Sequence, residues 1–364
     1  MKEGEEKKRW TDMARIKVEA GKPYEVIIEK GALTKAAEYI ASVTTSKKVA
    51  VITDDTVDSL YGDPFVCNLA SAGFETVKFT FPHGEASKNT STFIKIIDFL
   101  AENHLTRSDT VIALGGGVVG DISGFAAATY LRGIRYIQVP TTLLSAVDSS
   151  VGGKCAVDIP MGKNLLGAFH QPSVVICDYK TLDTLPREIF LDGCGEVLKY
   201  GILYSPDLLS HLSEKGTGFD REYVIGSCVQ LKADVVKRDE FDTGERAMLN
   251  LGHTVAHAIE KLSNMTISHG AAVATGCAVI ARASASAGIC TKDTSDKICD
   301  AVLALGHKLS CEYSAKDLCN AMLSDKKRHG NTVDLIVVED IGRCKILPIS
   351  TDDLLAFIEK GLRA

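Results

Sequence analysis

The sequence lacks an excess of basic residues. Lys and Arg together number 41, against 47 Asp and Glu, which gives a formal net charge of −6. Proteins that bind nucleic acids usually carry a strong positive excess, because many phosphates must be neutralised. The composition therefore argues against a nucleic-acid partner, although local basic clusters can still bind a small anion.

Long hydrophobic runs are also missing. No stretch reaches the roughly 18 to 20 unbroken apolar residues of a membrane helix, so no membrane partner is expected. The first residues, MKEGEEKKRW, are charged and have no apolar core of the kind that a secretory signal needs. We expect residues 1–14 to form a disordered tail.

Closely spaced cysteine pairs are absent as well. The 11 cysteines are an odd number, no CxxC pair occurs, and several lie in apolar runs, among them Cys177 and Cys277. This usage favours buried free thiols in a reducing compartment over a disulfide framework. We therefore expect a cytoplasmic protein.

The chain of 364 residues is long enough for two domains. Runs rich in Val and Ile predict buried strands over residues 47–54, 76–81, 110–117, 135–140 and 174–178. Helical patterns are found over residues 91–103, 120–131, 190–205, 222–238, 247–262, 271–287 and 317–322, and residues 334–340 and 345–349 predict a hairpin. This order predicts an N-terminal α/β domain (15–180) with a parallel, Rossmann-like sheet, and a mainly α-helical C-terminal domain (181–364).

A glycine-rich turn follows the strand predicted over residues 110–117. In GGGVVGD, Gly115, Gly117 and Gly120 match G-x-G-x-x-G between a predicted strand and a predicted helix. Glycines let the backbone approach a pyrophosphate, and a helix N-terminus donates N–H groups to it. The turn favours dinucleotide binding, the alternative being a tight turn without a ligand. It follows the third predicted strand and not the first, and Asp54 ends an earlier strand, where it can accept hydrogen bonds from a ribose.

Three histidines and a glutamate have the spacing of a metal site. His253 and His257 are four residues apart and share one helical face, and His269 begins the next predicted helix. Glu196 lies within an otherwise apolar helix, where a carboxylate is costly to bury unless it is paired or bound to a metal. One Glu and two His with an open position are a common catalytic zinc arrangement. Spacing alone leaves His257 or His269 as the second histidine, and Lys199 could simply pair with Glu196.

Basic and amide side chains occur in contexts that suit a doubly anionic ligand. Phosphate and carboxylate groups are bound best by several charged donors. Glycine-rich segments, expected to be loops, carry Lys154, Lys163 and Asn164, while helical segments carry Lys199, Lys232, Arg246 and Asn250, and a DKK motif carries Lys326 and Lys327. The helical pattern places Arg246 and Asn250 one turn apart, on the side of His253 and His257. The alternative is a set of ordinary solvated lysines.

Taken together, these motifs resemble the 3-dehydroquinate synthase family. The resemblance runs through PHGEASKN (82–89), GGGVVGD (115–121), YLRGIRYIQVPTTLLSAVDSSVGGK (130–154), GKNLLGAFHQP (162–172), TLDTLP (181–186), GEVLKYG (195–201), LNLGHTVAHAIE (249–260) and DKK (325–327). In order and spacing it covers nearly the whole chain after the tail.

The resemblance implies a role for each matching residue. It implies that zinc, with cobalt as an alternative, is bound by Glu196, His253 and His269. It implies NAD contacts at Asp54, Glu85, Lys88, Gly116, Gly117, Val118, Asp121, Thr141, Thr142, Lys163, Thr181 and Leu182, with Lys154 beside them. It implies substrate contacts at Asp148, Lys154, Asn164, Lys199, Lys232, Arg246, Asn250, His257 and one of Lys326 and Lys327. It also implies a homodimer in which Arg132 reaches into the partner subunit's site.

The implied reaction converts 3-deoxy-D-arabino-heptulosonate 7-phosphate into 3-dehydroquinate and phosphate. It proceeds through transient oxidation by NAD, phosphate elimination, reduction and an intramolecular aldol step, so NAD is not consumed. Four positions depart from the family pattern: Cys155, Asp158, Ala256 and Ala271. The rival interpretations are a glycerol-dehydrogenase-like oxidoreductase, a cyclase acting on another sugar phosphate, and a catalytically inactive binding protein.

Overall fold

The computed structural model describes residues 15–323 and 331–362, which form two compact units. The first unit extends to Leu185 and also includes Arg221–Phe241, and the second contains Pro186–Asp220 and Asp242 onward. The first unit therefore continues past the expected boundary at residue 180 to Leu185, and residues 221–241, expected in the second domain, belong to it. The expected tail lies outside the described residues.

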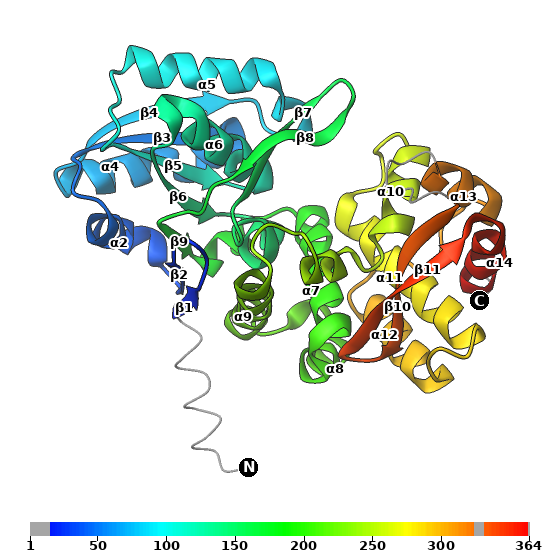
Figure 1. Cartoon of the computed structure of the whole chain (residues 1–364). Helices are drawn as coiled ribbons and strands as arrows, with labels where there is room; N and C mark the ends of the chain where they lie inside the picture. The colour runs from blue at the N-terminus through cyan, green and yellow to red at the C-terminus, as the bar shows by residue number, and fades with distance from the viewer. Residues whose placement is uncertain (1–14, 324–330, 363–364) are drawn as a thin grey trace, which may run out of the picture. The chain divides into compact units, whose positions relative to one another are not determined.

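The first unit is built on a seven-stranded sheet (Figure 1). Its strand order is β1-β2-β9-β6-β5-β3-β4, and all neighbours are parallel except β1 and β2. The strands are β1 (Arg15–Val18), β2 (Tyr24–Ile28), β3 (Lys48–Asp54), β4 (Glu75–Phe81), β5 (Thr110–Gly115), β6 (Arg135–Pro140) and β9 (Val174–Cys177). The predicted parallel sheet is confirmed, whereas β1 and β2 carry too weak a pattern to have been predicted.

Helices cover both faces of this sheet, which is why its inner strands, such as β5 and β9, are buried along their whole length. On β3, Val49 and Val51 pack with α2 (Ala36–Val43) and α4 (Asp63–Ser71), while the alternate residues pack with α5 (Thr90–Glu102) and α6 (Gly117–Thr129). Figure 1 shows α2 and α4 on one side and α5 on the other. The final helix of this unit, α9 (Arg221–Arg238), packs against β1 and β2, and this explains why residues 221–241 belong here.

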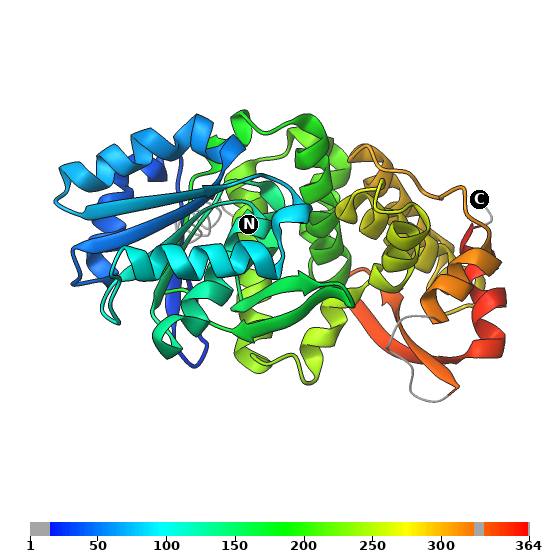
Figure 2. The ribbon, with the colours of Figure 1, turned by 90° about the horizontal axis from the view of Figure 1, so that it is seen from above.

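A second, antiparallel hairpin lies beside the main sheet. Strands β7 (Lys154–Ile159) and β8 (Gly162–Phe169) pair with each other and pack against α6, and the hairpin is also seen from above in Figure 2. The expectation of glycine-rich loops here was wrong, because Lys154 begins β7 and Lys163 and Asn164 lie in β8. Helix α6 also begins earlier than predicted and ends at Thr129, and Arg132 follows with a left-handed φ of 67°.

The second unit is organised around α11 (His269–Ser286). This helix contacts α7 (Arg187–Tyr204), α10 (His253–Leu262), α12 (Lys292–Ala304) and α14 (Thr351–Leu362). The other described elements of the unit are α8 (Pro206–Lys215), α13 (Ala315–Leu323), and the hairpin of β10 (Thr332–Asp340) and β11 (Arg343–Ser350). The mainly helical second half and its hairpin are confirmed.

The helix predicted over residues 247–262 is broken in the structure. Residues Glu245–Asn250 form a 3-10 helix, and α10 begins at His253 after Gly252, whose φ is +77°. A left-handed residue cannot continue an α-helix, so Arg246 and Asn250 do not share a helix with His253. Their expected common side was therefore wrong.

Two close helix crossings hold α11 against its neighbours. A Cβ atom at Gly195 of α7 would lie 2.0 Å from the carbonyl oxygen of Gly270, and one at Gly276 would lie 2.3 Å from the carbonyl oxygen of Gly252. Real Cβ atoms do not approach backbone so closely, so only glycine allows these contacts. The crossings fix α7 and the start of α10 on α11.

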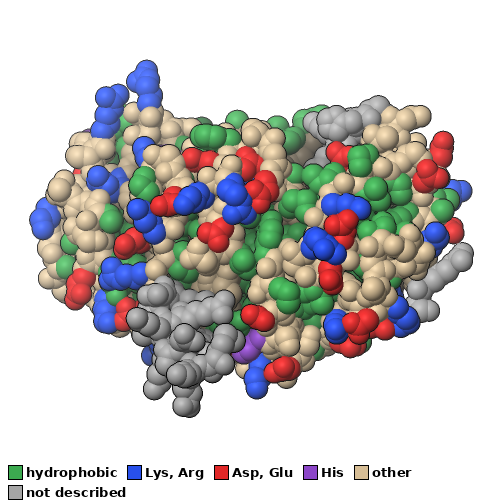
Figure 3. Space-filling view, turned by 60° about the horizontal axis from the view of Figure 1, so that its bottom comes forward, with side chains coloured by type: hydrophobic (Ala, Val, Ile, Leu, Met, Phe, Trp, Pro, Cys, Tyr) green, Lys and Arg blue, Asp and Glu red, His purple; other side chains and the backbone are tan. Residues whose placement is uncertain are grey.

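Charged side chains of both signs are interspersed on the face drawn in Figure 3. Within residues 15–323 and 331–362, no helix is both long and apolar enough to cross a membrane.

The crossing at Gly195 makes a prediction about stability. Gly195→Ala should lower the free energy of unfolding by about 1–3 kcal/mol or more, because the new methyl group forces α7 away from α11. Gly218→Ala is the matched control, since nothing lies within 4 Å of a Cβ there, and its effect should stay within about 0.5 kcal/mol. Chemical denaturation of both variants measures this difference, and equal stabilities would contradict the account of the crossing.

Candidate active site

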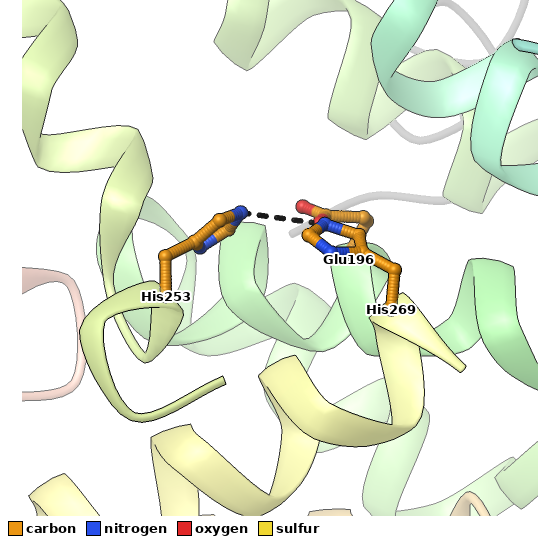
Figure 4. A group of neighbouring side chains, drawn as sticks. All are labelled: Glu196, His253 and His269. Carbon is orange, nitrogen blue, oxygen red and sulfur yellow. Dashed lines mark hydrogen bonds and ion pairs between the residues drawn. The ribbon is translucent and has the colours of Figure 1, made fainter. Parts of the chain in front are cut away.

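Three side chains of the second unit converge on one point (Figure 4). Glu196 extends from α7, His253 from the first turn of α10 and His269 from the first turn of α11. The Glu196 Oε1 atom lies 3.5 Å from His253 Nε2 and 3.1 Å from His269 Nε2. One ligand atom from each of the three residues lies within 4.8 Å of the others, which is the donor set of a divalent-metal site.

Each of these residues is the chain neighbour of a glycine at a helix crossing. Glu196 follows Gly195, His253 follows Gly252, and His269 precedes Gly270. Because these glycines set how closely the backbones approach, the side chains beside them are brought within reach of one another. The packing of the unit thus assembles the site.

Burial and the neighbouring carboxylates set the protonation of the two imidazoles in opposite directions. Burial lowers the pKa of His253 to about 3, and Nδ1 lies 3.1 Å from the carbonyl oxygen of Leu251, so the neutral ring donates from Nδ1 and turns its Nε2 lone pair toward Glu196. For His269, burial alone would lower the pKa, but the carboxylates of Glu196 and Glu260 outweigh it and raise the pKa to about 10. Without a metal, this ring therefore carries its proton between two carboxylates.

The residue spacing left two alternatives open: His257 in place of His269 as the second histidine, and a simple pair of Lys199 with Glu196. The ring of His257 is 5.7 Å from that of His253 and 6.5 Å from that of His269, and His257 is not in the converging set found among the described residues. Lys199 does pair with Glu196, its Nζ atom lying 2.5 Å from Oε2. The pair with Lys199 is therefore present and leaves Oε1 facing the two imidazoles, so metal ligation by Glu196 stays a prediction.

The residues expected to bind NAD lie at one edge of the sheet in the first unit. Asp54 ends β3, Gly116 and Gly117 follow β5, Thr141 and Thr142 follow β6, and Thr181 and Leu182 follow β9. These strands are parallel, so their carboxyl ends meet at the same edge, which is where open α/β sheets bind ligands. Asp54 accepts a hydrogen bond from the backbone N–H of Val57, and burial raises its pKa.

The glycine turn leaves no room for side chains. A Cβ at Gly116 would lie 2.9 Å from Thr142 Cγ2, and one at Gly120 would lie 2.8 Å from the side-chain oxygen of Gln138. Gly116 is the N-cap of α6, and neither a side-chain cap nor an acidic residue occupies the first turn. The exposed N–H groups of such a turn bind anions.

A polar cluster around the buried Lys88 joins this region to the β7–β8 hairpin. Lys88 donates to Asp121 at 2.5 Å and to the side-chain oxygen of Asn164 at 2.7 Å. Burial would lower the pKa of Lys88, but the Asp121 carboxylate raises it. The Asp158 carboxylate, a departure from the family pattern, accepts a hydrogen bond from the backbone N–H of Asn164 at 2.7 Å. Both the side chain and the backbone N–H of Asn164 are thus hydrogen-bonded, and its backbone has a left-handed φ of +55°.

The other expected NAD contacts lie around this cluster and turn. The Nζ atom of Lys163 is 4.0 Å from Glu85, and Val118 is partly buried against the core of the unit. Their roles remain predictions.

The expected substrate residues are divided between the two units. Asp148, Lys154, Asn164 and Lys232 belong to the first, and Lys199, Arg246, Asn250 and His257 belong to the second. Within the first unit, the Nζ atom of Lys232 lies 2.7 Å from the Asp148 carboxylate and 2.6 Å from its carbonyl oxygen.

In the second unit, Arg246 is 2% exposed, and Asn250 donates to the carbonyl oxygen of Ala247 at 3.0 Å. Arg132 is exposed, while Lys326 and Lys327 lie outside the described residues.

One residue of this region was not found from the sequence. Glu260, on α10, is buried, and its Oε1 atom lies 3.4 Å from Nδ1 of His269. The signal was present, since Glu260 lies seven residues after His253 and hence on the same face of α10, but a lone glutamate near a helix end is usually solvated.

Sequence comparison places the whole of this architecture in one family. The 3-dehydroquinate synthase N-terminal family matches residues 78–192, and the 3-dehydroquinate synthase C-terminal family matches residues 193–328. The 3-dehydroquinate synthase of Streptococcus mutans is 40% identical over 348 residues, which is 93% of this chain and 98% of that protein. The chain belongs to the 3-dehydroquinate synthase family. It is an enzyme of this kind.

Two solved structures of other synthases share the fold of this 3-dehydroquinate synthase family member. A 2-deoxy-scyllo-inosose synthase complexed with carbaglucose-6-phosphate, NAD+ and Co2+ has a TM-score of 0.87 at 22% identity, covering 96% of this chain and 100% of that one. A 2-epi-5-epi-valiolone synthase from Streptomyces hygroscopicus with NAD+ and Zn2+ bound has a TM-score of 0.83 at 23% identity, covering 93% and 96%. At these identities the likeness shows the fold.

The converging set makes a prediction about metal binding. Glu196→Gln and His253→Ala should each lose bound zinc, whereas His257→Ala should retain one equivalent per chain, because its ring lies outside the set. Elemental analysis after gel filtration measures the stoichiometry. Loss of the metal from His257→Ala, with the metal retained in His253→Ala, would mean that the ligands are wrongly assigned.

Proposed function

We propose that this chain is a 3-dehydroquinate synthase that converts 3-deoxy-D-arabino-heptulosonate 7-phosphate into 3-dehydroquinate and phosphate. The family supports the reaction, and the single structural observation that carries it is the converging set of Glu196, His253 and His269. When bound, NAD supplies a reversible hydride acceptor and a divalent metal polarises substrate oxygen atoms. The chain's own residues must then bind, orient and charge-balance the substrate.

The first unit fits NAD. The glycine turn brings the backbone to the carboxyl edge of the sheet, and the uncapped start of α6 offers N–H groups to a pyrophosphate. In the described part of the chain, the buried hydroxyl of Thr141, directly after β6, has no hydrogen-bond partner. Several buried hydroxyls of the described residues share this property, and the place of Thr141 at the carboxyl end of β6 is what makes it support a ligand at the same edge.

The second unit fits a divalent metal such as zinc. Two imidazole nitrogens and a carboxylate oxygen are the protein ligands of many catalytic zinc sites, which keep further positions for substrate. Neutral His253 already has a lone pair facing the site. We propose zinc as the metal, with cobalt as a functional substitute.

Lys199 balances charge beside this site. Its side chain is 2% exposed and that of Glu196 is 1% exposed, so the ammonium stays paired with the carboxylate away from bulk water. A fixed, buried cation of this kind stabilises negative charge that develops on a nearby substrate oxygen, at no cost of reorganisation. Lys199 thus neutralises the carboxylate of Glu196 and also stabilises negative charge on the substrate.

We propose that the remaining polar residues hold the two anionic ends of the substrate. Lys232 is fixed by both oxygen acceptors of Asp148, and with Arg246 it suits a carboxylate. Phosphate would be held by Lys154, Asn164, Asn250, His257 and one lysine of the DKK motif. Preorganised donors of this kind contribute through positioning and electrostatics.

We also propose that the enzyme is cytoplasmic and acts as a homodimer. Its 11 cysteines support the compartment, since all those in the described residues are free. The exposed Arg132, in a left-handed backbone conformation just after α6, supports the dimer, because it is available to reach a partner subunit's substrate.

Turnover with NAD present in amounts well below those of the substrate tests the function. We expect many phosphate ions released per NAD and no accumulation of NADH, because the hydride returns within each cycle. A dehydrogenase would instead form one NADH for each substrate oxidised, and an inactive binding protein would release no phosphate. Phosphate release and nicotinamide absorbance are followed in the same sample.

Two controls complete this test. Removal of the metal by a chelator should abolish phosphate release, and zinc should restore it. His253→Ala should be inactive while still binding NAD, since the dinucleotide residues lie in the other unit. A different carbocycle in the product spectrum would identify another sugar-phosphate cyclase and contradict the proposed substrate.

A further inference from the structure

The two histidines of the converging set are held from behind in different ways. His253 Nδ1 faces the main-chain carbonyl of Leu251 at 3.1 Å, whereas His269 Nδ1 faces the carboxylate of Glu260 at 3.4 Å. A carboxylate partner fixes a ring more firmly than a carbonyl, because the hydrogen bond is charge-assisted. The two rings are therefore not equivalent.

We propose that Glu260 is a positioning residue of the metal centre, which holds His269 through Nδ1 so that Nε2 faces the metal. The inference rests on the proposed function, since it requires that the centre bind a metal. It assigns Glu260 the place of the carboxylate in a carboxylate–histidine–metal arrangement, in which the outer group fixes the ring and raises its basicity.

The position of Glu260 argues against a role as a ligand. Glu196 approaches Nε2 of His269 at 3.1 Å, and Glu260 approaches the other ring nitrogen. The two nitrogens of an imidazole point in divergent directions, so Glu260 lies on the side of the ring away from the converging atoms. Among the described residues, the set of mutually close ligand atoms contains Glu196, His253 and His269, and Glu260 is not part of it.

The burial of Glu260 argues against a merely solvated glutamate. Its side chain is 8% exposed, and a buried carboxylate is costly unless it is hydrogen-bonded or paired. The contact with His269 also joins α10 to α11, the two helices that carry both histidines. An interhelical contact could be purely structural, so a test must separate support of the fold from support of the metal.

The charges near the centre are consistent with this role. Glu196 and Glu260 together carry two negative charges, and the ammonium group of Lys199, paired with Glu196, offsets one of them. With His269 neutral, as ligation through Nε2 requires, one net negative charge therefore remains to favour a divalent cation. Neutralising Glu260 removes that charge and leaves Lys199 balanced by Glu196 alone.

Zinc affinity of Glu260→Gln, measured on the full chain by competition with a chromophoric chelator, tests the inference. The isosteric amide should weaken zinc binding about 10- to 100-fold, with one site per chain retained. The absorption spectrum of the cobalt-substituted protein should change, because the ring orientation changes. Thermal unfolding of the metal-free protein measures separately any stability lost with the Glu260–His269 contact, whereas a purely structural role would leave the cobalt spectrum and the zinc affinity of the folded protein unchanged.

Two further variants make the result decisive. Glu188→Gln, an exposed glutamate on α7, is the matched control and should leave zinc affinity unchanged. Glu260→Asp keeps the charge but withdraws the carboxylate by one methylene group, so it should also weaken zinc binding. It serves as the second test if Glu260→Gln folds poorly.

Three outcomes would overturn the inference. An unchanged zinc affinity in Glu260→Gln and Glu260→Asp would show that the contact does not support the metal. Complete loss of zinc, as expected for His253→Ala, would make Glu260 a ligand. A wild-type chain that binds no metal would refute the metal-dependent function itself, which distinguishes that failure from a failure of the role of Glu260.

Discussion

The second unit depends on the close approach of α11 to its neighbours at glycines. Gly195 and Gly270 let α7 meet α11, and Gly252 and Gly276 let the turn before α10 meet it. A methyl group at any of these positions would overlap backbone or side-chain atoms. The side chains of Glu196, His253 and His269 lie beside these contacts, so the same constraint that packs the helices also brings the three donors together. The glycine contacts of α11 therefore contribute both to the stability of the unit and to the geometry of the site.

Burial then gives the donors their electrostatic character. Glu196 is almost completely enclosed, yet one oxygen faces Lys199 and the other faces two imidazoles. In such surroundings each charge is costly unless it has a partner, and each partner acts strongly. Lys199 provides a partner for Glu196, and Glu260 provides one for His269. In the first unit, the polar groups at the edge of the sheet are of a different kind. They are the backbone N–H groups of the glycine turn and the ion pair of Lys88 with Asp121.

Much of this could be predicted from the sequence, because the decisive signals were local. The apolar runs of β3 to β6 and β9, and the helical periodicity of the second half, follow from burial patterns. The break at Gly252 was missed, because the periodic pattern continues across it. The place of α9 in the first unit is a tertiary fact with no local signal. Glu260 was missed for a similar reason, since its partner His269 lies on another helix.

X-ray absorption at the zinc edge of the purified enzyme tests the central claim most directly. We expect a first shell of nitrogen and oxygen only, with multiple scattering from two imidazoles, at about 2.0–2.2 Å. With 11 cysteines in the chain, thiolate ligation is the real competitor. A sulfur shell at about 2.3 Å, or scattering from a single imidazole, would contradict a centre built from Glu196, His253 and His269.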